Sequence, residues 1–128
     1  MLIPPSPNET AVLFGLDGSL GSELSGALAA QGRLTRSEPV PDGTLGGRAL
    51  SPRDISVVFC LAKRRCYEPV LELVKHARPD LPVVVVSRGA DSFEWLNALE
   101  AGAADYCSAP FQSGQISWIL EGLRRYAP

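Results

Sequence analysis

The sequence lacks the features that mark several large classes of protein. No apolar run among its 128 residues approaches the roughly 20 that a membrane-spanning helix needs. The start, MLIPPSPNET, has neither the positive region nor the long apolar core of a secretory signal. One histidine and three cysteines offer no metal-ligand spacing and no Ser-His-Asp or Cys-His arrangement. These absences predict a cytoplasmic protein with reduced thiols, no metal, no membrane contact and no enzymatic activity.

Charge is also sparse and nearly balanced. Charged residues make up 20% of the chain, and 12 Lys+Arg against 14 Asp+Glu leave a net charge of −2. This balance argues against direct binding of nucleic acid, which usually needs a strongly basic face. Hydrophobic residues make up 45%, enough for a core in one domain of this length. We expect a flexible leader over residues 1–10 and one folded domain over residues 11–126.

Apolar runs alternate with helical periodicity along the chain. The predicted strands cover residues 11–16, 33–37, 54–61, 83–87 and 104–107. The predicted helices run from residue 19 or 22 to 31, and over residues 67–77, 93–101 and 113–125. Residues 38–52 hold three prolines and three glycines, so a helix there is short or missing. The alternation predicts an α/β fold, a parallel sheet with helices on both faces and functional loops at the carboxyl ends of its strands.

The second half carries a more specific pattern. The segments Leu81-Pro-Val-Val-Val-Val-Ser87, Ala98-Leu-Glu-Ala-Gly-Ala-Ala-Asp-Tyr106 and Pro110-Phe111, with their spacing, resemble the receiver domains of bacterial two-component response regulators. The resemblance covers about residues 11–126. It implies a flavodoxin-like, doubly wound sheet of five strands in the order 2-1-3-4-5. It also implies a cis peptide bond before Pro110.

The chemistry of receivers does not follow with the pattern. Receivers hold Mg²⁺ on an acidic pair after the first strand, accept a phosphoryl group on an aspartate ending the third strand, and place a lysine before the Pro-Phe. The corresponding positions here are Gly15 and Leu16 for the acidic pair, Phe59 or Cys60 for the phosphoacceptor, and Ala109 for the lysine. None of these side chains can form an acyl phosphate or supply the carboxylate oxygens that Mg²⁺ prefers. The resemblance therefore implies a degenerate phosphorylation site with no Mg²⁺ or other cofactor.

Three residues keep part of the family pattern. Asp17 is the sole nearby carboxylate, one position beyond the acidic pair. Ser87 and Tyr106 fit the positions of the receiver hydroxyl and aromatic residue, and they could form a switch pair in which the ring turns inward. Alternatively, Ser87 only ends a strand and Tyr106 packs against the helix that carries Phe93.

Four basic residues would lie near the strand ends, where a receiver is acidic: Lys63, Arg64, Arg65 and Arg88. Four cations and one carboxylate could bind an anion, either a phosphate, a nucleotide or an acidic segment. Alternatively they form a solvated basic loop, since charge runs on surface loops contribute little. A small-anion or nucleotide sensor that uses these loops is thus the alternative function.

Two cysteines also invite a functional interpretation. Cys60 and Cys107 would end neighbouring strands in the receiver order, close enough for a redox pair. The alternative is that both are small buried side chains.

The function that the resemblance implies is a phosphorylation-independent interaction module in bacterial signal transduction or transcription regulation. It would bind a protein partner or a second copy through the last two helices and the strand between them, and the resemblance also implies a C-terminal output domain in a full-length chain. The candidate interface residues are Glu94, Trp95, Asn97, Trp118 and Tyr126, because tryptophan and tyrosine are enriched at binding hot spots. Alternatively, Trp95 and Trp118 belong to the core.

Overall fold

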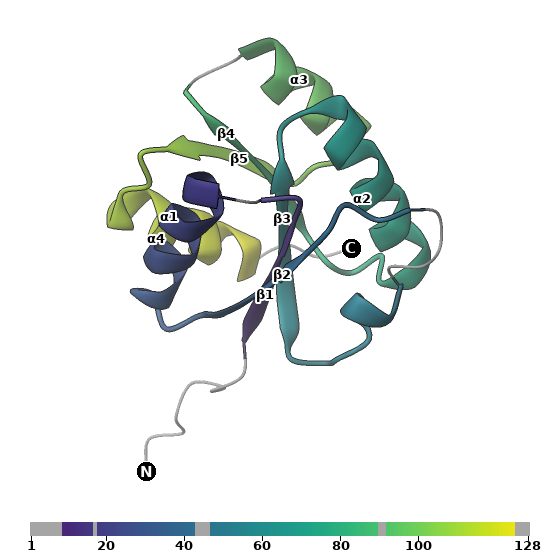
Figure 1. Cartoon of the computed structure of the whole chain (residues 1–128), viewed down its shortest axis with the longest axis horizontal. Coiled ribbons are helices and arrows are strands. Elements are labelled where there is room, and N and C mark those ends of the chain that lie inside the picture. Colours follow the sequence, from purple (N-terminus) through teal and green to yellow (C-terminus); the bar gives the residue numbers. More distant parts are fainter. Residues whose placement is uncertain (1–8, 17, 43–46, 90–91, 125–128) are drawn as a thin grey trace.

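The structure, a computed structural model, describes residues 9–16, 18–42, 47–89 and 92–124. Its strands form one parallel sheet in the order β2-β1-β3-β4-β5, as the resemblance implies (Figure 1). The strands are β1 (Thr10–Phe14), β2 (Leu34–Glu38), β3 (Ile55–Leu61), β4 (Val83–Arg88) and β5 (Asp105–Ala109). The described helices are α1 (Gly18–Ala29), the 3-10 helix η1 (Gly47–Leu50), α2 (Arg64–Ala77), α3 (Ser92–Ala101) and α4 (Ser113–Arg124).

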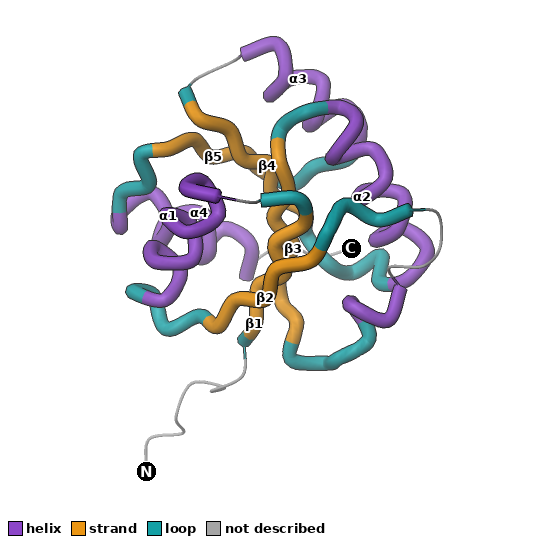
Figure 2. Tube along the Cα trace, in the orientation of Figure 1, coloured by secondary structure: helices purple, strands orange, loops and turns teal. Residues whose placement is uncertain are grey.

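Two hydrophobic clusters lie on the two faces of the sheet. Alternate residues of the central strands supply them, as Val12 and Leu13 of β1 illustrate, since successive strand side chains point to opposite faces. Helices α2, α3 and η1 contribute to the cluster that contains Val12, and α1 and α4 to the one that contains Leu13 (Figure 2). The predicted doubly wound architecture is therefore confirmed, with β1, β3 and β4 buried on both faces.

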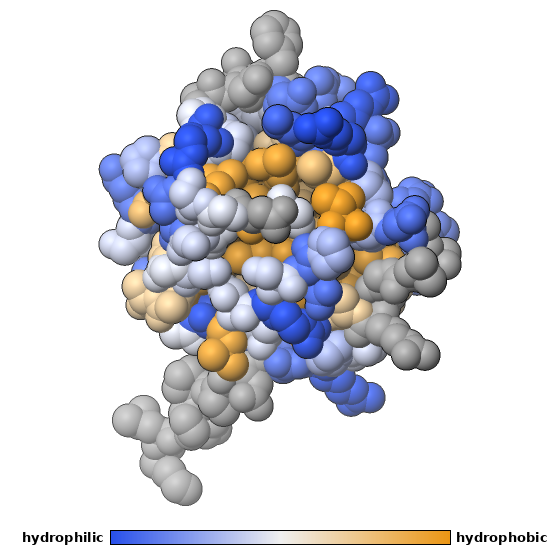
Figure 3. Space-filling model, viewed as in Figure 1, coloured by the Kyte–Doolittle hydropathy of each residue, from blue (hydrophilic) through white to orange (hydrophobic). Residues whose placement is uncertain are grey.

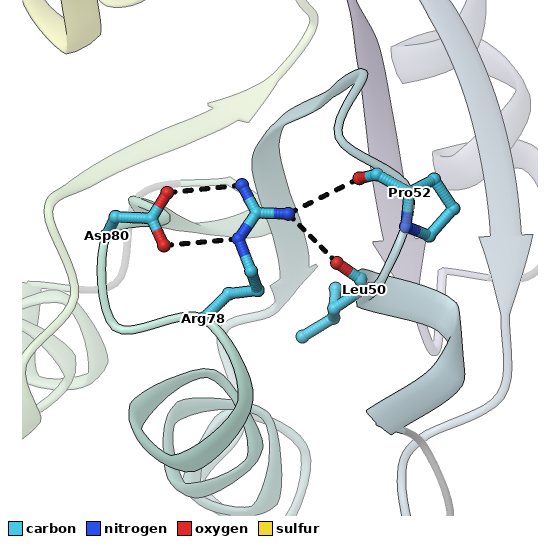
Figure 4. A network of polar contacts seen from close by, with 4 residues as sticks. All are labelled: Leu50, Pro52, Arg78 and Asp80. Carbon is cyan, nitrogen blue, oxygen red and sulfur yellow. Dashed lines mark hydrogen bonds and ion pairs between the residues drawn. The ribbon is translucent and has the colours of Figure 1, made fainter.

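A network around Arg78 ties η1 to the end of α2. The Arg78 guanidinium donates to the carbonyl oxygens of Leu50 (3.0 Å) and Pro52 (3.3 Å), and it forms a bidentate pair with Asp80 (3.1 Å for each bond; Figure 4). Leu50 is fully buried in the core. The hydrogen bonds from Arg78 also hold the pKa of the Asp80 carboxyl below its usual range. The second helix of the pattern was predicted to be short or missing, and the described part of residues 38–52 contains one short 3-10 helix, η1, which Arg78 anchors.

Several element boundaries differ from the prediction by one to three residues, and two of them bear on the site. Strand β1 ends at Phe14, not at Leu16, because Gly15 takes a positive φ of 68° that leaves the strand conformation. Helix α2 begins at Arg64, not at Tyr67, and the N–H groups of Cys66 (2.7 Å) and Tyr67 (2.9 Å) both donate to the carbonyl of Lys63.

The earlier start of α2 changes where Pro69 lies. This proline was expected to be tolerable only in a first turn, but it falls in the second turn of the helix. There it cannot donate to the carbonyl of Arg65, four residues earlier.

The first described residues are part of the fold. Glu9 pairs with the buried Arg33, and the Thr10 hydroxyl donates to Asp54 (2.8 Å), so the last two residues of the predicted leader pack on the domain. Residues 1–8 lie outside the described residues. In the part of the chain that the structure describes, no helix has the length and apolar character needed to cross a membrane.

Candidate functional site

The carboxyl ends of β3 and β4 open into a cleft of about 850 Å³ between α1, α2 and α3, which we call the strand-end cleft. Its apolar lining comes from Leu20 of α1 and from Leu61 and Ala62 at the end of β3. Its polar and charged lining consists of Lys63, Arg64, Arg65, Ser87, Arg88, Gly89 and Glu94. The cleft therefore lies where a doubly wound sheet is expected to place its functional loops.

The two candidate phosphoacceptor positions lie inside β3 and away from this cleft. Phe59 and Cys60 are fully buried, on opposite faces of the sheet, level with Val84 and Val85 of β4. The strand continues to Leu61, and the N–H of the next residue, Ala62, still donates to β4 (2.7 Å, Val86 carbonyl). Leu61 and Ala62, which carry no carboxylate, thus stand at the strand end.

Burial also makes the two strand cysteines unreactive. Desolvation, with a smaller effect from nearby Cys66, raises the pKa of the Cys60 thiol far above neutral pH. Desolvation raises the pKa of Cys107 to about 12. The expectation that Cys60 and Cys107 end neighbouring strands is wrong, because β4 lies between β3 and β5 and the two side chains belong to opposite clusters. The alternative of small buried side chains fits this arrangement.

The positions of the receiver acidic pair and lysine are likewise apolar. Leu16 and Ala109 are buried, and a side chain at Gly15 would meet Val40 Cγ2 at 2.6 Å. The peptide bond between Ala109 and Pro110 is cis, as the resemblance implies. Asp17 lies outside the described residues, and the described ranges hold no group of three or more His, Cys, Asp or Glu suited to a metal ion.

Ser87 and Tyr106 come together at the ends of β4 and β5. Their hydroxyl oxygens are 2.5 Å apart, and both donate to the carbonyl of Gly89, Ser87 at 2.6 Å and Tyr106 at 3.1 Å. The Tyr106 ring also packs on α3, where its centroid lies 6.0 Å from that of Trp95 at a tilt of 36°. Tyr106 thus packs on α3, as one alternative expected, and also contacts the Ser87 hydroxyl; a switch in which the ring turns inward stays a prediction.

The four predicted basic residues differ in their partners. Arg88 pairs with Glu23 (2.5 Å) and donates to Ser19, and Arg64 pairs with Glu68 (3.0 Å) along the helix. Lys63 and Arg65 make no ion pair within the described ranges, and both are exposed at the start of α2. Two of the four cations are thus already compensated. The long-range partner Glu23 had no signal in the sequence, since it lies 65 residues from Arg88.

The predicted interface residues do not share one surface. Trp118 is 79% exposed and Trp95 is 39% exposed, so the alternative that both belong to the core is wrong. Helix α4 buries Ile116, Ile119 and Leu120 instead. Two other candidates face a different way: Glu94 lines the strand-end cleft, and Asn97 lines a groove beside α2. Tyr126 lies outside the described residues.

Comparison with solved structures identifies the fold. The receiver domain of NtrX from Brucella abortus matches with a TM-score of 0.73 and 21% identity, covering 91% of this chain and 99% of that one. The fold is that of response-regulator receiver domains. Full-length FixJ from B. japonicum matches with a TM-score of 0.70 and 17% identity over 91% of this chain and 58% of that one. NtrX in complex with ADP matches at 22% identity and a TM-score of 0.72 over 89% of this chain. This chain covers 25% of that longer protein. No family model and no curated protein matches the chain.

Proposed function

We propose that this chain is a receiver-like interaction module in bacterial signal transduction or transcription regulation that works without phosphorylation and catalyses no reaction. The receiver fold supports the signalling role. Independence from phosphorylation is supported by Leu61 and Ala62, which take the strand end, and by Ala109, which takes the position of the lysine. A phosphoryl group would meet neither a carboxylate nucleophile on β3 nor an ammonium group on β5.

The observation that carries the proposal is a set of large apolar side chains on α3, β5 and α4 that are exposed or half-buried, which we call the aromatic face. It consists of Trp95 and Leu96 on α3, Tyr106 on β5 and Trp118 on α4. Leu96 is 51% exposed and Trp118 is 79% exposed. Large apolar side chains exposed on a small domain are typical of a surface that binds another protein, and tryptophan and tyrosine are enriched at the centre of such surfaces.

The outer edge of β5 favours docking through side chains over addition of another strand. The Tyr106 N–H donates to its neighbour's carboxylate, Asp105 Oδ1, at 2.8 Å. This donor is therefore already used, and a carboxylate stands beside it. Charged side chains on edge strands oppose pairing with a further strand. A partner would contact the aromatic residues on either side of the strand instead.

Charge favours a heterologous partner over a symmetric homodimer. Residues 89–123 include no Lys, Arg or His but five acidic residues: Asp91, Glu94, Glu100, Asp105 and Glu121. Glu94 and Glu100 line other surfaces, so Asp105 of β5 and Glu121 of α4 supply the negative charge on the elements of the aromatic face. A symmetric contact between two copies places the same patch against itself. Like charges would then face each other, whereas a basic partner would complement them.

Site-specific cross-linking tests the proposal. A photo-crosslinking phenylalanine analogue replaces Trp118 in one variant and Leu34, an exposed residue of β2 at the opposite edge of the sheet, in the control. We expect a discrete adduct in cells from position 118 and none from position 34, and Trp95→Ala should reduce it. The mass of the adduct separates a homodimer from another partner. The same adducts from both positions, or none from position 118, would contradict the proposal.

Independence from phosphorylation has its own test. Beryllofluoride with Mg²⁺ mimics an aspartyl phosphate, so an unreactive chain should show no saturable shift of the Ser87 and Tyr106 amide resonances. Saturable shifts at these residues would refute this part of the proposal and leave the docking surface unaffected.

A further inference from the structure

We propose a second function for this domain: the strand-end cleft binds an organic anion that carries one anionic group on an apolar body. The proposal rests on the size, floor and charges of the cleft. It does not depend on the aromatic face, which lies on α3, β5 and α4.

The size of the cleft favours an occupant larger than a bare inorganic anion. Its volume of about 850 Å³ lies within the range of small-molecule sites, about 300–1,000 Å³. Phosphate has five heavy atoms, and even at about 30 Å³ for each, the share of a water molecule in the liquid, it takes up about 150 Å³. Most of the cleft would remain filled with water.

The floor of the cleft is apolar where a phosphorylation site would be acidic. Leu61 and Ala62 follow the buried part of β3, and Leu20 of α1 faces them across the cleft. Figure 3 shows hydrophobic side chains gathered over the ends of the central strands, with hydrophilic side chains around them. Water over such a floor is displaced favourably by an apolar group. The floor therefore selects a ligand with an apolar body.

The rim of the cleft supplies positive charge that no ion pair among the described residues neutralises. Arg64 and Arg88 are paired with Glu68 and Glu23, but Lys63 and Arg65 form no ion pair within the described residues. Both stand at the start of α2, where the helix dipole makes positive charge unfavourable. An anionic group between them would remove this repulsion and gain charge-assisted hydrogen bonds.

A carboxylate limits how much negative charge the ligand can carry. Glu94 lines the same cleft from α3. A polyanion that filled the cleft would bring negative charge towards Glu94, whereas a ligand with a single anionic group near Lys63 and Arg65 would not. The lining thus favours an amphiphilic anion over a nucleotide polyphosphate.

Fluorescence titration with 1-anilinonaphthalene-8-sulfonate tests the proposal, because this probe joins one sulfonate to an apolar body. Two further probes separate its properties: N-phenyl-1-naphthylamine has the same body without the charge, and inorganic phosphate has charge without the body. We expect saturable binding of one sulfonate probe per folded chain, with amide shifts at Ala62 and Ser87. The neutral probe and phosphate should bind at least about tenfold more weakly.

Matched variants locate the site. The double variant Lys63→Gln/Arg65→Gln should weaken binding of the sulfonate probe by about tenfold or more, because it removes both uncompensated cations. Lys75→Gln is the control, since Lys75 is an exposed lysine in the last turn of the same helix. Each variant is compared with the parent by thermal unfolding, so that probe bound to a partly unfolded chain is recognised.

Four results would overturn the proposal. They are the absence of saturable binding at millimolar probe, equal binding by the double variant, tighter binding of phosphate than of the sulfonate probe, and amide shifts confined to the aromatic face. None of them bears on the cross-linking from position 118, so the proposed docking function is decided separately.

Discussion

Restoring an aspartate at the position suggested by sequence spacing should destroy the fold and leave phosphorylation chemistry absent. Phe59 lies five residues after Asp54, the spacing at which receivers carry their phosphoacceptor. In the structure it is fully buried among the side chains that α1 and α4 cover. Phe59→Asp therefore places a carboxylate in the apolar core instead of in the strand-end cleft.

The cost of Phe59→Asp follows from two effects. Truncating a buried phenylalanine costs about 3–5 kcal/mol through lost burial and the cavity that remains. Burying an unpaired carboxylate costs several kcal/mol more. The sum reaches the total stability of a typical domain, about 5–15 kcal/mol. We expect the variant to be largely unfolded at neutral pH.

Leu61→Asp is the matched control. Leu61 is half-buried and lines the cleft together with Lys63 and Arg65, so an aspartate at position 61 is exposed to water and lies in the same cleft as these two cations, which form no ion pair with a described residue. We expect Leu61→Asp to lower the free energy of unfolding by about 1–3 kcal/mol and to leave the chain folded. Circular dichroism and urea titration measure both variants. If Phe59→Asp folds and its free energy of unfolding is less than about 2 kcal/mol below that of the parent, the placement of Phe59 in the core is refuted. Saturable Mg²⁺-dependent binding of beryllofluoride by that variant would refute the reasoning about the site.

Three further predictions concern the polar networks. Arg78→Met should lower the free energy of unfolding, measured by urea titration, by about 2–3 kcal/mol, because the carbonyls of Leu50 and Pro52 lose their donor. Asp80→Asn should lower it by less than about 1 kcal/mol, because the ion pair between Arg78 and Asp80 is half exposed. The pKa of Asp80 is lower in the folded chain than in the unfolded chain, where it is about 4. The ionised carboxylate therefore contributes its full stabilisation above about pH 4, and this stabilisation is lost as the pH falls through the folded pKa. The difference between wild type and Asp80→Asn should therefore vanish in acid urea titrations. Tyr106→Phe should cost about 1–2 kcal/mol and change the fluorescence of Trp95, and an unchanged spectrum would contradict the ring contact.

The order of elements could be predicted because it rests on local patterns. The run Val83–Val86 is apolar throughout and becomes a strand buried on both faces, and the periodicity of Ile116, Ile119 and Leu120 gives the buried side of α4. The same periodicity leaves Trp118 off the stripe, so its exposure had a signal in the sequence. The cis bond before Pro110 came from the family resemblance.

The end of β3 at Leu61 was predicted correctly, but the position of the phosphoacceptor residue relative to that end could not be predicted, because it depends on contacts between strands. Spacing from Asp54 indicated Phe59, but β3 extends to Leu61 and α2 begins at Arg64. Nor does local sequence show that Arg78 would anchor a distant carbonyl pair, since that contact spans 28 residues.

The two proposed surfaces are joined by one small network, and this limits how strongly they can influence each other. Ser87 lines the strand-end cleft, and its hydroxyl bonds to Tyr106, whose ring packs on Trp95 of the aromatic face. A ligand changes a conformational equilibrium only by the difference in its affinity for the two states. Three short contacts link Ser87, Tyr106 and Gly89, but the two hydroxyls have only two protons to donate, so at most two of these contacts are hydrogen bonds at one time, each with a net contribution of about 1 kcal/mol. An occupant of the cleft that broke both hydrogen bonds could therefore alter affinity at the aromatic face by at most about 2 kcal/mol, roughly 30-fold.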